Sequence, residues 1–305
     1  MNETEDEIRE EPEMARRRRS RRAFLGYAGL AGAALLAVDG FVIEPGNVEF
    51  THHELGTPVP GGRPFRFAQL TDLHLSGVGG MHREIAETIG RLNLDFLLIT
   101  GDAIDDNYHL GALDQFLALF RQELPKYAIL GNWEHWGKVR RGSLEELYKR
   151  RNCELLVNRT VTARGGDREL LITGLDDSVA GLPSPEFALE GIEPGEHHIL
   201  LAHSPSYRDY LLDYNHLAHE HTGRLTPPID FDSYGVKYIF SGHTHGGQVN
   251  LLGITPYLPK GCGRYLAGWY RERAPYLYVS RGVGTSILPV RIGSRPEVAL
   301  FTMWN

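Results

Sequence analysis

This chain has few sulfur-containing residues and no excess of positive charge. It contains two cysteines, Cys153 and Cys262, and four methionines in 305 residues. Two cysteines without CxxC spacing exclude a disulfide framework and a thiolate site for zinc or redox chemistry. The net charge of −7 at pH 7 provides no general excess of basic residues for binding phosphate backbones, which disfavours nucleic acid as a partner.

The sequence also has no internal repeat or low-complexity tract after residue 40. This excludes collagen and coiled coils, and the composition excludes a protein with many membrane spans. Hydrophobic residues make up 42% of the chain and aromatic residues 10%, enough for a sizeable core. The 35 glycines and 17 prolines favour many short strands joined by tight turns over a helical bundle.

The N-terminus has the charge order of an export signal. An acidic leader, a basic block at 16–22 and an apolar run at 23–38 follow one another. The stretch Ser20-Arg21-Arg22-Ala23-Phe24-Leu25 resembles a twin-arginine signal, so the export machinery that reads this signal is the expected partner. We expect a protein exported across the cytoplasmic membrane, either membrane-anchored or free on the outer side.

Three segments are predicted. Residues 1–40 form the signal or an N-terminal anchor, with Met14 as an alternative start because an acidic leader is foreign to such signals. The segment lacks a clean cleavage site, which leaves retention as an anchor open, although the apolar run is shorter than the roughly 20 residues of a comfortable span. Residues 41–63 form a lead-in strand and turn, and residues 64–305 form the main domain.

Short apolar runs, each ended by polar or glycine residues, predict buried strands. They lie at 65–70, 96–100, 127–130, 170–173, 199–202, 238–240, 277–279 and 298–302, after the lead-in strand at 47–53. Helical periodicity occurs at 82–92, 112–122, 143–151 and 207–214. Because strands alternate with helices early and dominate later, we expect an α/β sandwich rather than one doubly wound sheet.

Side chains that bind metals follow five of these predicted strands. They are Asp72 with His74, Asp102, Asn132, His203, and His243 with His245. Ligands in α/β proteins bind beyond the carboxyl ends of strands, so we expect the seven side chains to converge. Carboxylate, imidazole and amide ligands suit Mn, Fe or Zn better than Ca, which takes oxygen alone, or a structural zinc, which prefers thiolates.

The motifs around these residues resemble those of the calcineurin-like metallophosphoesterases. They are Thr71-Asp72-Leu73-His74, Gly101-Asp102-Ala103-Ile104-Asp105, Gly131-Asn132, His203 and Gly242-His243-Thr244-His245-Gly246-Gly247-Gln248, in this order. The last motif is similar to that of an exported or membrane-anchored bacterial branch, which often carries a twin-arginine signal. The resemblance covers about residues 65–303.

This resemblance implies a four-layer α/β/β/α sandwich with two mixed sheets and a site for two divalent metal ions, manganese being favoured. One ion would be held by Asp72, His74, Asp102 and His245, and the other by Asp102, Asn132, His203 and His243. Asp102 would bridge them. Two such ions lower the pKa of a shared water, which then attacks the phosphorus. Asp105 is a candidate for orienting a ligand histidine.

The chain departs from the family pattern at Trp133. Where Gly-Asn-His-Asp/Glu is expected, the chain has Gly131-Asn132-Trp133-Glu134-His135. The family histidine is associated with protonating the leaving oxygen, and an indole cannot transfer a proton in this way. Either His135 is the acid through a shifted loop, or no acid is present. The second alternative favours pyrophosphate-linked or aryl-like substrates, whose leaving groups are weak bases.

The sequence thus predicts a phosphohydrolase that cleaves a phosphodiester or pyrophosphate bond near the membrane surface. The resemblance suggests a lipid-linked substrate of the UDP-diacylglucosamine type. A general phosphodiesterase or phosphomonoesterase and a binding protein that keeps its metals without turnover remain alternatives, as does a structural protein of the cell wall. Residues 211–232 are a candidate lid over the substrate.

Overall fold

The structure is a computed structural model that describes residues 24–32, 34, 36–166, 168–193, 197–212, 231, 233–251 and 253–304. The predicted signal residues Arg21 and Arg22, the alternative start Met14 and most of the candidate lid at 211–232 lie outside the described residues.

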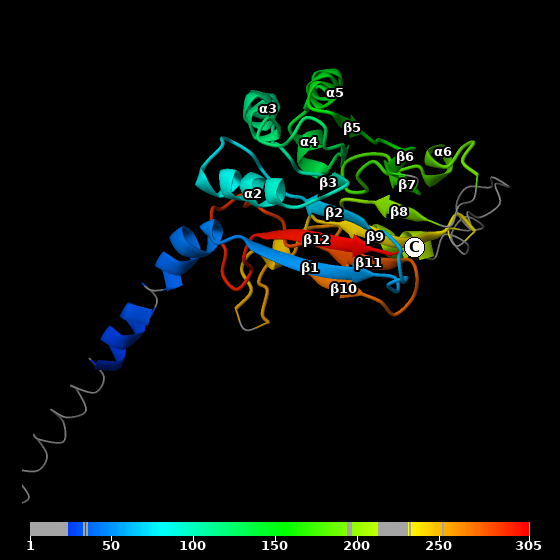
Figure 1. The fold of residues 1–305 in the computed structure, drawn as a ribbon. Helices are drawn as coiled ribbons and strands as arrows, with labels where there is room; N and C mark the ends of the chain where they lie inside the picture. Colours follow the sequence, from blue (N-terminus) through cyan, green and yellow to red (C-terminus); the bar gives the residue numbers. More distant parts are fainter. Residues whose placement is uncertain are drawn as a thin grey trace, which may run out of the picture.

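An apolar helix, Phe24–Gly46, precedes the domain and projects away from it (Figure 1). Its 23 residues are long and apolar enough to cross a membrane, and a signal sequence meets the same criteria. The predicted boundary at residue 40 falls inside this helix, which ends in η1 (Asp39–Ile43) and η2 (Glu44–Gly46). The boundary was placed where the apolar run at 23–38 stops. The helix continues beyond it because the backbone N–H of Glu44 still bonds to Asp39 O.

Two six-stranded sheets form the centre of the domain. The first sheet has the spatial order β1 (Glu49–Leu55), β12 (Glu297–Met303), β2 (Phe65–Leu70), β3 (Phe96–Thr100), β4 (Lys126–Ile129) and β5 (Cys153–Leu155). The second has the order β10 (Gly268–Tyr270), β11 (Tyr276–Val279), β9 (Val236–Ser241), β8 (His198–Leu201), β7 (Arg168–Gly174) and β6 (Arg159–Gly165). The lead-in segment thus supplies the edge strand β1, which pairs parallel with β12.

Both sheets mix parallel and antiparallel pairs. In the first sheet β2, β3 and β4 run parallel while β12 is antiparallel to β2. In the second, β7, β8, β9 and β11 run parallel while β6 and β10 are antiparallel to their neighbours. The carboxyl ends of the parallel strands therefore meet at one edge of each sheet, where ligand-binding loops are expected.

Helices cover the outer faces of both sheets. On the first sheet lie α2 (Gly80–Arg91), α3 (Leu110–Leu117) and α5 (Arg141–Arg150), seen together in Figure 1. Side chains such as Ile85, Phe116 and Leu147 from these helices pack with β3 residues in one core. On the second sheet, α6 (Pro185–Ala188) and helical residues 207–212 pack through another core. The predicted four-layer α/β/β/α sandwich is therefore confirmed.

A third core joins the two sheets. Phe67 and Phe96 of the first sheet lie parallel at 4.9 Å between ring centroids, and Phe240 of the second contacts Phe67 edge-on at 5.5 Å. All three side chains are buried. Because the sheets are packed through large rings at close contact, the strand ends that carry the site are fixed relative to one another.

Some elements differ from the prediction. The apolar pattern does not predict the strands β5, β6 and β10, because they are short or rich in arginine and glycine rather than continuously apolar. The helix predicted to end at 122 ends at Leu117, where Leu119 and Phe120 bond three residues back in tighter turns. The short helix α4 (Asn132–Trp136) has too few residues to show periodicity.

Candidate metal centre

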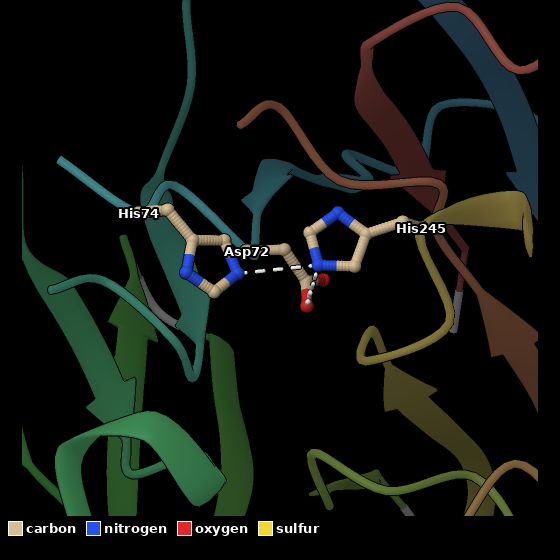
Figure 2. A group of neighbouring side chains, drawn as sticks. All are labelled: Asp72, His74 and His245. Atoms are coloured by element: carbon tan, nitrogen blue, oxygen red, sulfur yellow. Dashed lines mark hydrogen bonds and ion pairs between the residues drawn. The ribbon is translucent and has the colours of Figure 1, made fainter. Parts of the chain in front are cut away.

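The first group of candidate ligands combines the end of β2 with the turn after β9. Asp72 and His74 follow β2, and His245 begins η4 (His245–Gly247). His74 Nε2 lies 3.2 Å from His245 Nε2, which lies 3.5 Å from Asp72 Oδ1 (Figure 2). Zinc–nitrogen bonds are about 2.0–2.1 Å long, so two imidazole nitrogens at this separation fit around one cation.

The second group lies beside the first. Asp102 follows β3, His203 follows β8 and His243 follows β9. Asp102 Oδ2 is 3.1 Å from His203 Nε2, and His203 Nε2 is 3.3 Å from His243 Nδ1. The same Asp102 oxygen is also 3.9 Å from His74 Nε2 of the first group. One carboxylate oxygen therefore faces both groups.

Three of the candidate ligand histidines form a hydrogen bond through the ring nitrogen that faces away from the site, and this bond orients the ring. His74 Nδ1 lies 2.5 Å from Asp105 Oδ1, His203 Nδ1 donates to Thr100 O at 2.8 Å, and His243 Nε2 donates to Lys260 O at 2.8 Å. In the neutral tautomer that each bond selects, the other ring nitrogen, which faces the site, carries no proton. This is the arrangement that a metal-ligating histidine needs, because the outer partner selects the tautomer and aligns the ring.

The backbone at the candidate ligands is left-handed. Residues Asp72, His74, Asp102, His243 and His245 have φ values of 50°, 43°, 51°, 73° and 51°. Such conformations cost free energy for residues other than glycine and cluster at functional sites. Gly242 begins the last motif, and a Cβ at this position would overlap the side chains of Thr71 and Asp72. The motif glycine thus lets two ligand loops touch.

Glu134 is a functional residue that the sequence analysis did not assign a role. Its two oxygens accept from the backbone N–H groups of Asp102, Ala103, Ile104 and Gly131, at 2.6–3.3 Å. The buried carboxylate therefore ties the loop after β3 to the loop after β4. The acidic position of the family motif Gly-Asn-His-Asp/Glu was the signal that pointed to it.

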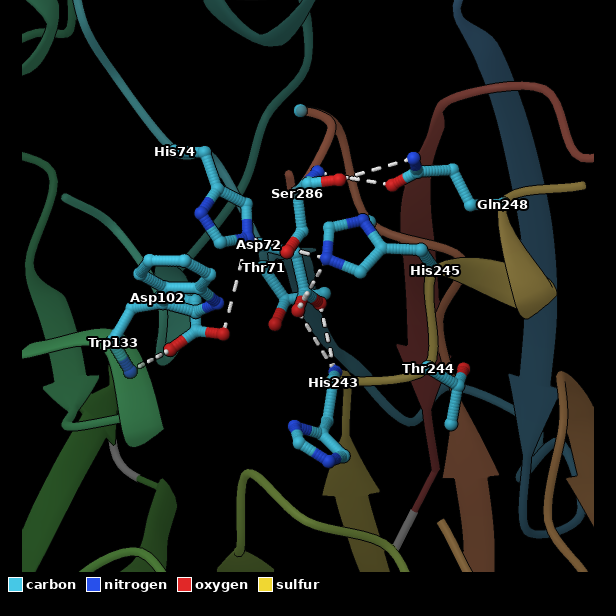
Figure 3. Close-up of polar contacts among 12 residues, drawn as sticks. Thr71, Asp72, His74, Asp102, Trp133, His243, Thr244, His245, Gln248 and Ser286 are labelled. Atoms are coloured by element: carbon cyan, nitrogen blue, oxygen red, sulfur yellow. Dashed lines mark hydrogen bonds and ion pairs between the residues drawn. The ribbon is translucent and has the colours of Figure 1, made fainter. Parts of the chain in front are cut away.

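Trp133 occupies the site in place of the family histidine. Its backbone N–H donates to Asp102 Oδ1 at 2.9 Å, which leaves Asp102 Oδ2 for the ligand cluster (Figure 3). Its ring contacts the His74 ring edge-on, with centroids 5.7 Å apart. The main chain of this position thus holds the candidate ligand Asp102, and the indole adds apolar surface beside it.

A pocket of about 450 Å³ opens beside the two ligand groups. Its lining includes the candidate ligands Asp102, Asn132, His243 and His245, and the rest of its wall is mostly apolar. The described wall residues include Trp133, Trp136, Val249, Pro256, Tyr257, Pro259, Ile287, Leu288 and Val290. Candidate metal ligands beside a mostly apolar wall suit a molecule with an anionic end and an apolar part.

His135, the candidate acid, points toward a neighbouring loop. Its Nε2 lies 2.7 Å from Asp176 Oδ1, and this hydrogen bond raises the pKa of His135. His135 is not one of the described residues that line the pocket. Its role as a proton donor stays a prediction.

The buried acidic and amide groups of the site fit divalent cations. Three carboxylates, Asp72, Asp102 and Glu134, are buried together. Burial raises the pKa of Asp72, and it raises that of Glu134 to about 7, with the negative charge of Asp102 adding to both. Asn132 Oδ1 is buried without a hydrogen-bond partner. Cations would offset the buried charge and give this amide oxygen a partner.

The comparison with protein-family models settles the family. The model described as calcineurin-like phosphoesterase matches residues 65–247. The chain belongs to the calcineurin-like phosphoesterase family. It is therefore a metallophosphoesterase, a hydrolase of phosphoester bonds, and the family implies divalent metal ions at the two ligand groups.

Several relatives share this family assignment. The uncharacterized metallophosphoesterase YkuE of Bacillus subtilis is 29% identical over 300 residues, which are 93% of this chain and 97% of the relative. The phosphodiesterase YaeI of Escherichia coli is 28% identical over 294 residues, 93% of this chain and 99% of the relative. A transmembrane protein with a metallophosphoesterase domain from Bos taurus is 28% identical over 256 residues, 78% of this chain and 53% of the relative.

Among solved structures, a 5'-nucleotidase precursor from Thermus thermophilus is 15% identical with a TM-score of 0.39. The match covers 78% of this metallophosphoesterase and 55% of that chain. The NAD nucleotidase of Haemophilus influenzae gives a TM-score of 0.39 at 14% identity, covering 72% of this chain and 45% of that one. This chain thus spans about half the length of both solved proteins.

Proposed function

We propose that this metallophosphoesterase uses two divalent ions, manganese being favoured, to hydrolyse a phosphodiester or pyrophosphate bond. The observation that carries the dinuclear assignment is the position of Asp102 Oδ2, 3.1 Å from His203 Nε2 and 3.9 Å from His74 Nε2. A carboxylate oxygen between two ligand groups is suited to bridge two ions. Asn132 would complete the group that contains His203 and His243.

When bound, two such ions supply a water of lowered pKa and positive charge for the phosphoryl oxygens. The residues of the chain hold this arrangement in place. The hydrogen bonds from His203 to Thr100 and from His243 to Lys260 align these two rings, and Asp105 aligns His74. Glu134 keeps the Asp102 loop against the Asn132 loop.

We further propose a lipid-linked substrate, of the UDP-diacylglucosamine type. The walls of the pocket support this, because Trp133, Tyr257 and Leu288 offer apolar surface next to the candidate metal ligands. A hydrophilic phosphomonoester would leave these walls exposed to water, whereas an acyl or aromatic group would cover them.

The leaving group decides whether Trp133 is compatible with turnover. Without a proton donor at this position, we expect rates of the full chain with Mn²⁺ to fall steeply as the leaving-group pKa of a phosphodiester series rises. Trp133→His should flatten this dependence, and aryl and pyrophosphate substrates should be the best. The measurement is initial rate against leaving-group pKa, with metal content determined on the same samples.

The control is His135→Ala. If no acid is present, this variant should leave the slope unchanged. A loss of about 10²–10⁴-fold confined to poor leaving groups would instead assign the acid to His135. A shallow dependence in the wild type that survives His135→Ala would contradict both versions. No turnover of any phosphoester by the metal-loaded chain would overturn the proposed function.

We also propose export by the twin-arginine route, with the N-terminal helix as signal or anchor. This route carries folded proteins, which allows metals to be loaded before export. Changing Arg21 and Arg22 together to lysine should retain the protein in the cytoplasm, as measured by cell fractionation with immunodetection. Export of the double variant at the wild-type level would show that another route is used.

A further inference from the structure

Exposed apolar side chains gather on two loops beside the pocket. We call this set the apolar rim; it consists of Leu251, Ile254, Tyr257, Leu258, Ile287 and Leu288. Ile254 is 73% exposed and Ile287 is 78% exposed. Soluble proteins seldom place several large aliphatic side chains together in water, so such a set marks a contact surface.

Hydrogen bonds with the side chain of Gln248 hold the rim loop at 286–288 in place. The Gln248 side-chain amide donates to Ser286 O at 3.1 Å, and its oxygen accepts from Ser286 N at 2.9 Å (Figure 3). The same amide also donates to Leu288 O at 2.8 Å. Gln248 follows the ligand turn η4 directly. Ile287 has a φ of 64°, a left-handed conformation that is costly for a β-branched residue. The fold therefore holds Ile287 outward at a cost in stability.

Both rim loops meet at the base of the N-terminal helix. Asn250 N donates to Ile292 O at 2.7 Å, which joins the loop carrying Leu251 to the segment after Leu288. Arg291 N donates to Gly40 O at 2.9 Å. The buried Glu44 carboxylate accepts from Gly293 N at 2.9 Å, and Gly40 leaves no room for a Cβ beside Ile292. The rim is thus anchored to the helix end.

We propose that the apolar rim is a membrane-docking surface that inserts into the same bilayer as the helix Phe24–Gly46. The helix is long and apolar enough to cross a membrane, and its last turns, from Gly40 onward, are held by the domain, so its base would lie at the interface. Loops tied to that base then meet the headgroup layer. Tyr257, Ile287 and Leu288 belong both to the rim and to the pocket wall, so the pocket opens toward the lipid.

The docking is tested with a fluorescent reporter that does not depend on activity. The full chain is reconstituted in phosphatidylethanolamine–phosphatidylglycerol vesicles, with bimane attached at Ile254→Cys and acyl-chain nitroxide lipids as quenchers. The control is Phe187→Cys on α6, 66% exposed and at the other end of the domain from the helix (Figure 1). Cys153 and Cys262 are buried, so the unsubstituted chain gives the labelling background.

We expect quenching at position 254 to be at least threefold stronger than at position 187. Equal and weak quenching at both would overturn the proposal. Pyrene at position 254 is the second measurement: excimer emission without lipid quenching would show that a second copy of the chain covers the rim, and would also overturn it.

Access of substrate from the lipid rests on the proposed function, so it is tested separately. Leu251→Asp with Ile254→Asp changes two rim residues outside the pocket wall. Turnover of a vesicle-embedded amphiphilic phosphodiester should fall about tenfold, while that of a soluble aryl phosphodiester stays unchanged; Phe187→Asp should affect neither. Unchanged vesicle turnover would overturn the access role. If the wild type cleaves neither substrate, the proposed function fails, whereas the quenching result still decides the docking.

Discussion

Replacing Asp102 by asparagine is expected to remove both metal ions and to lower turnover by about 10³-fold or more. Asparagine keeps an oxygen for the Trp133 N–H, so the loop should fold as before. Its amide nitrogen would then face His203 Nε2 and His74 Nε2, at the places where Asp102 Oδ2 lies 3.1 Å and 3.9 Å away. A neutral donor would replace the bridging anion. Metal analysis per chain and initial rates measure the effect.

The matched control is Asp105→Asn. Asp105 contacts the far side of the His74 ring and does not face the other ligands, so this variant should keep both metal sites and lose metal affinity by roughly 10–100-fold. At saturating Mn²⁺ its turnover should approach that of the wild type. Full metal content and full activity in Asp102→Asn would refute the dinuclear assignment.

Glu134→Ala should lower the free energy of unfolding by about 3–5 kcal/mol. The change leaves the backbone N–H groups of Asp102, Ala103 and Gly131 buried without their acceptor, and each unsatisfied group costs about 1–3 kcal/mol before relaxation. Glu134→Gln should lie between the wild type and the alanine variant, since one of its two acceptor oxygens remains. Denaturant unfolding followed by tryptophan fluorescence measures the order.

The control for this series is Glu145→Ala on α5. Glu145 forms an exposed pair with Arg141 at 2.8 Å, and such pairs contribute about 0.3–0.5 kcal/mol. If Glu134→Ala is as stable as Glu145→Ala, the carboxylate does not anchor the two loops. Metal binding should weaken in parallel with stability in the Glu134 variants, because the Asp102 loop loses its support.

The positions of the ligand-bearing strands were predictable because buried strands are continuous apolar runs that end where polar residues begin. Phe65–Leu70 and Phe96–Thr100 have the predicted bounds, and the others that were predicted differ by one to three residues at their ends. The strands β5, β6 and β10 could not be predicted in this way because their burial depends on neighbours in the sheet. Arg159–Gly165, for example, pairs with β7 along seven residues although few of its side chains are apolar.

The sequence by itself determined the layered fold and the kind of ligand at each strand end, since the periodicity of apolar residues and the chemistry of carboxylates and imidazoles are local properties. The tertiary structure alone decided which candidate ligands lie together, that Glu134 links two loops, and that His135 turns to Asp176. Only the tertiary structure brought the loops that carry the exposed Ile254 and Ile287 to the base of the helix. These relations depend on distances between residues far apart in the chain, and only the packing of the two sheets sets those distances.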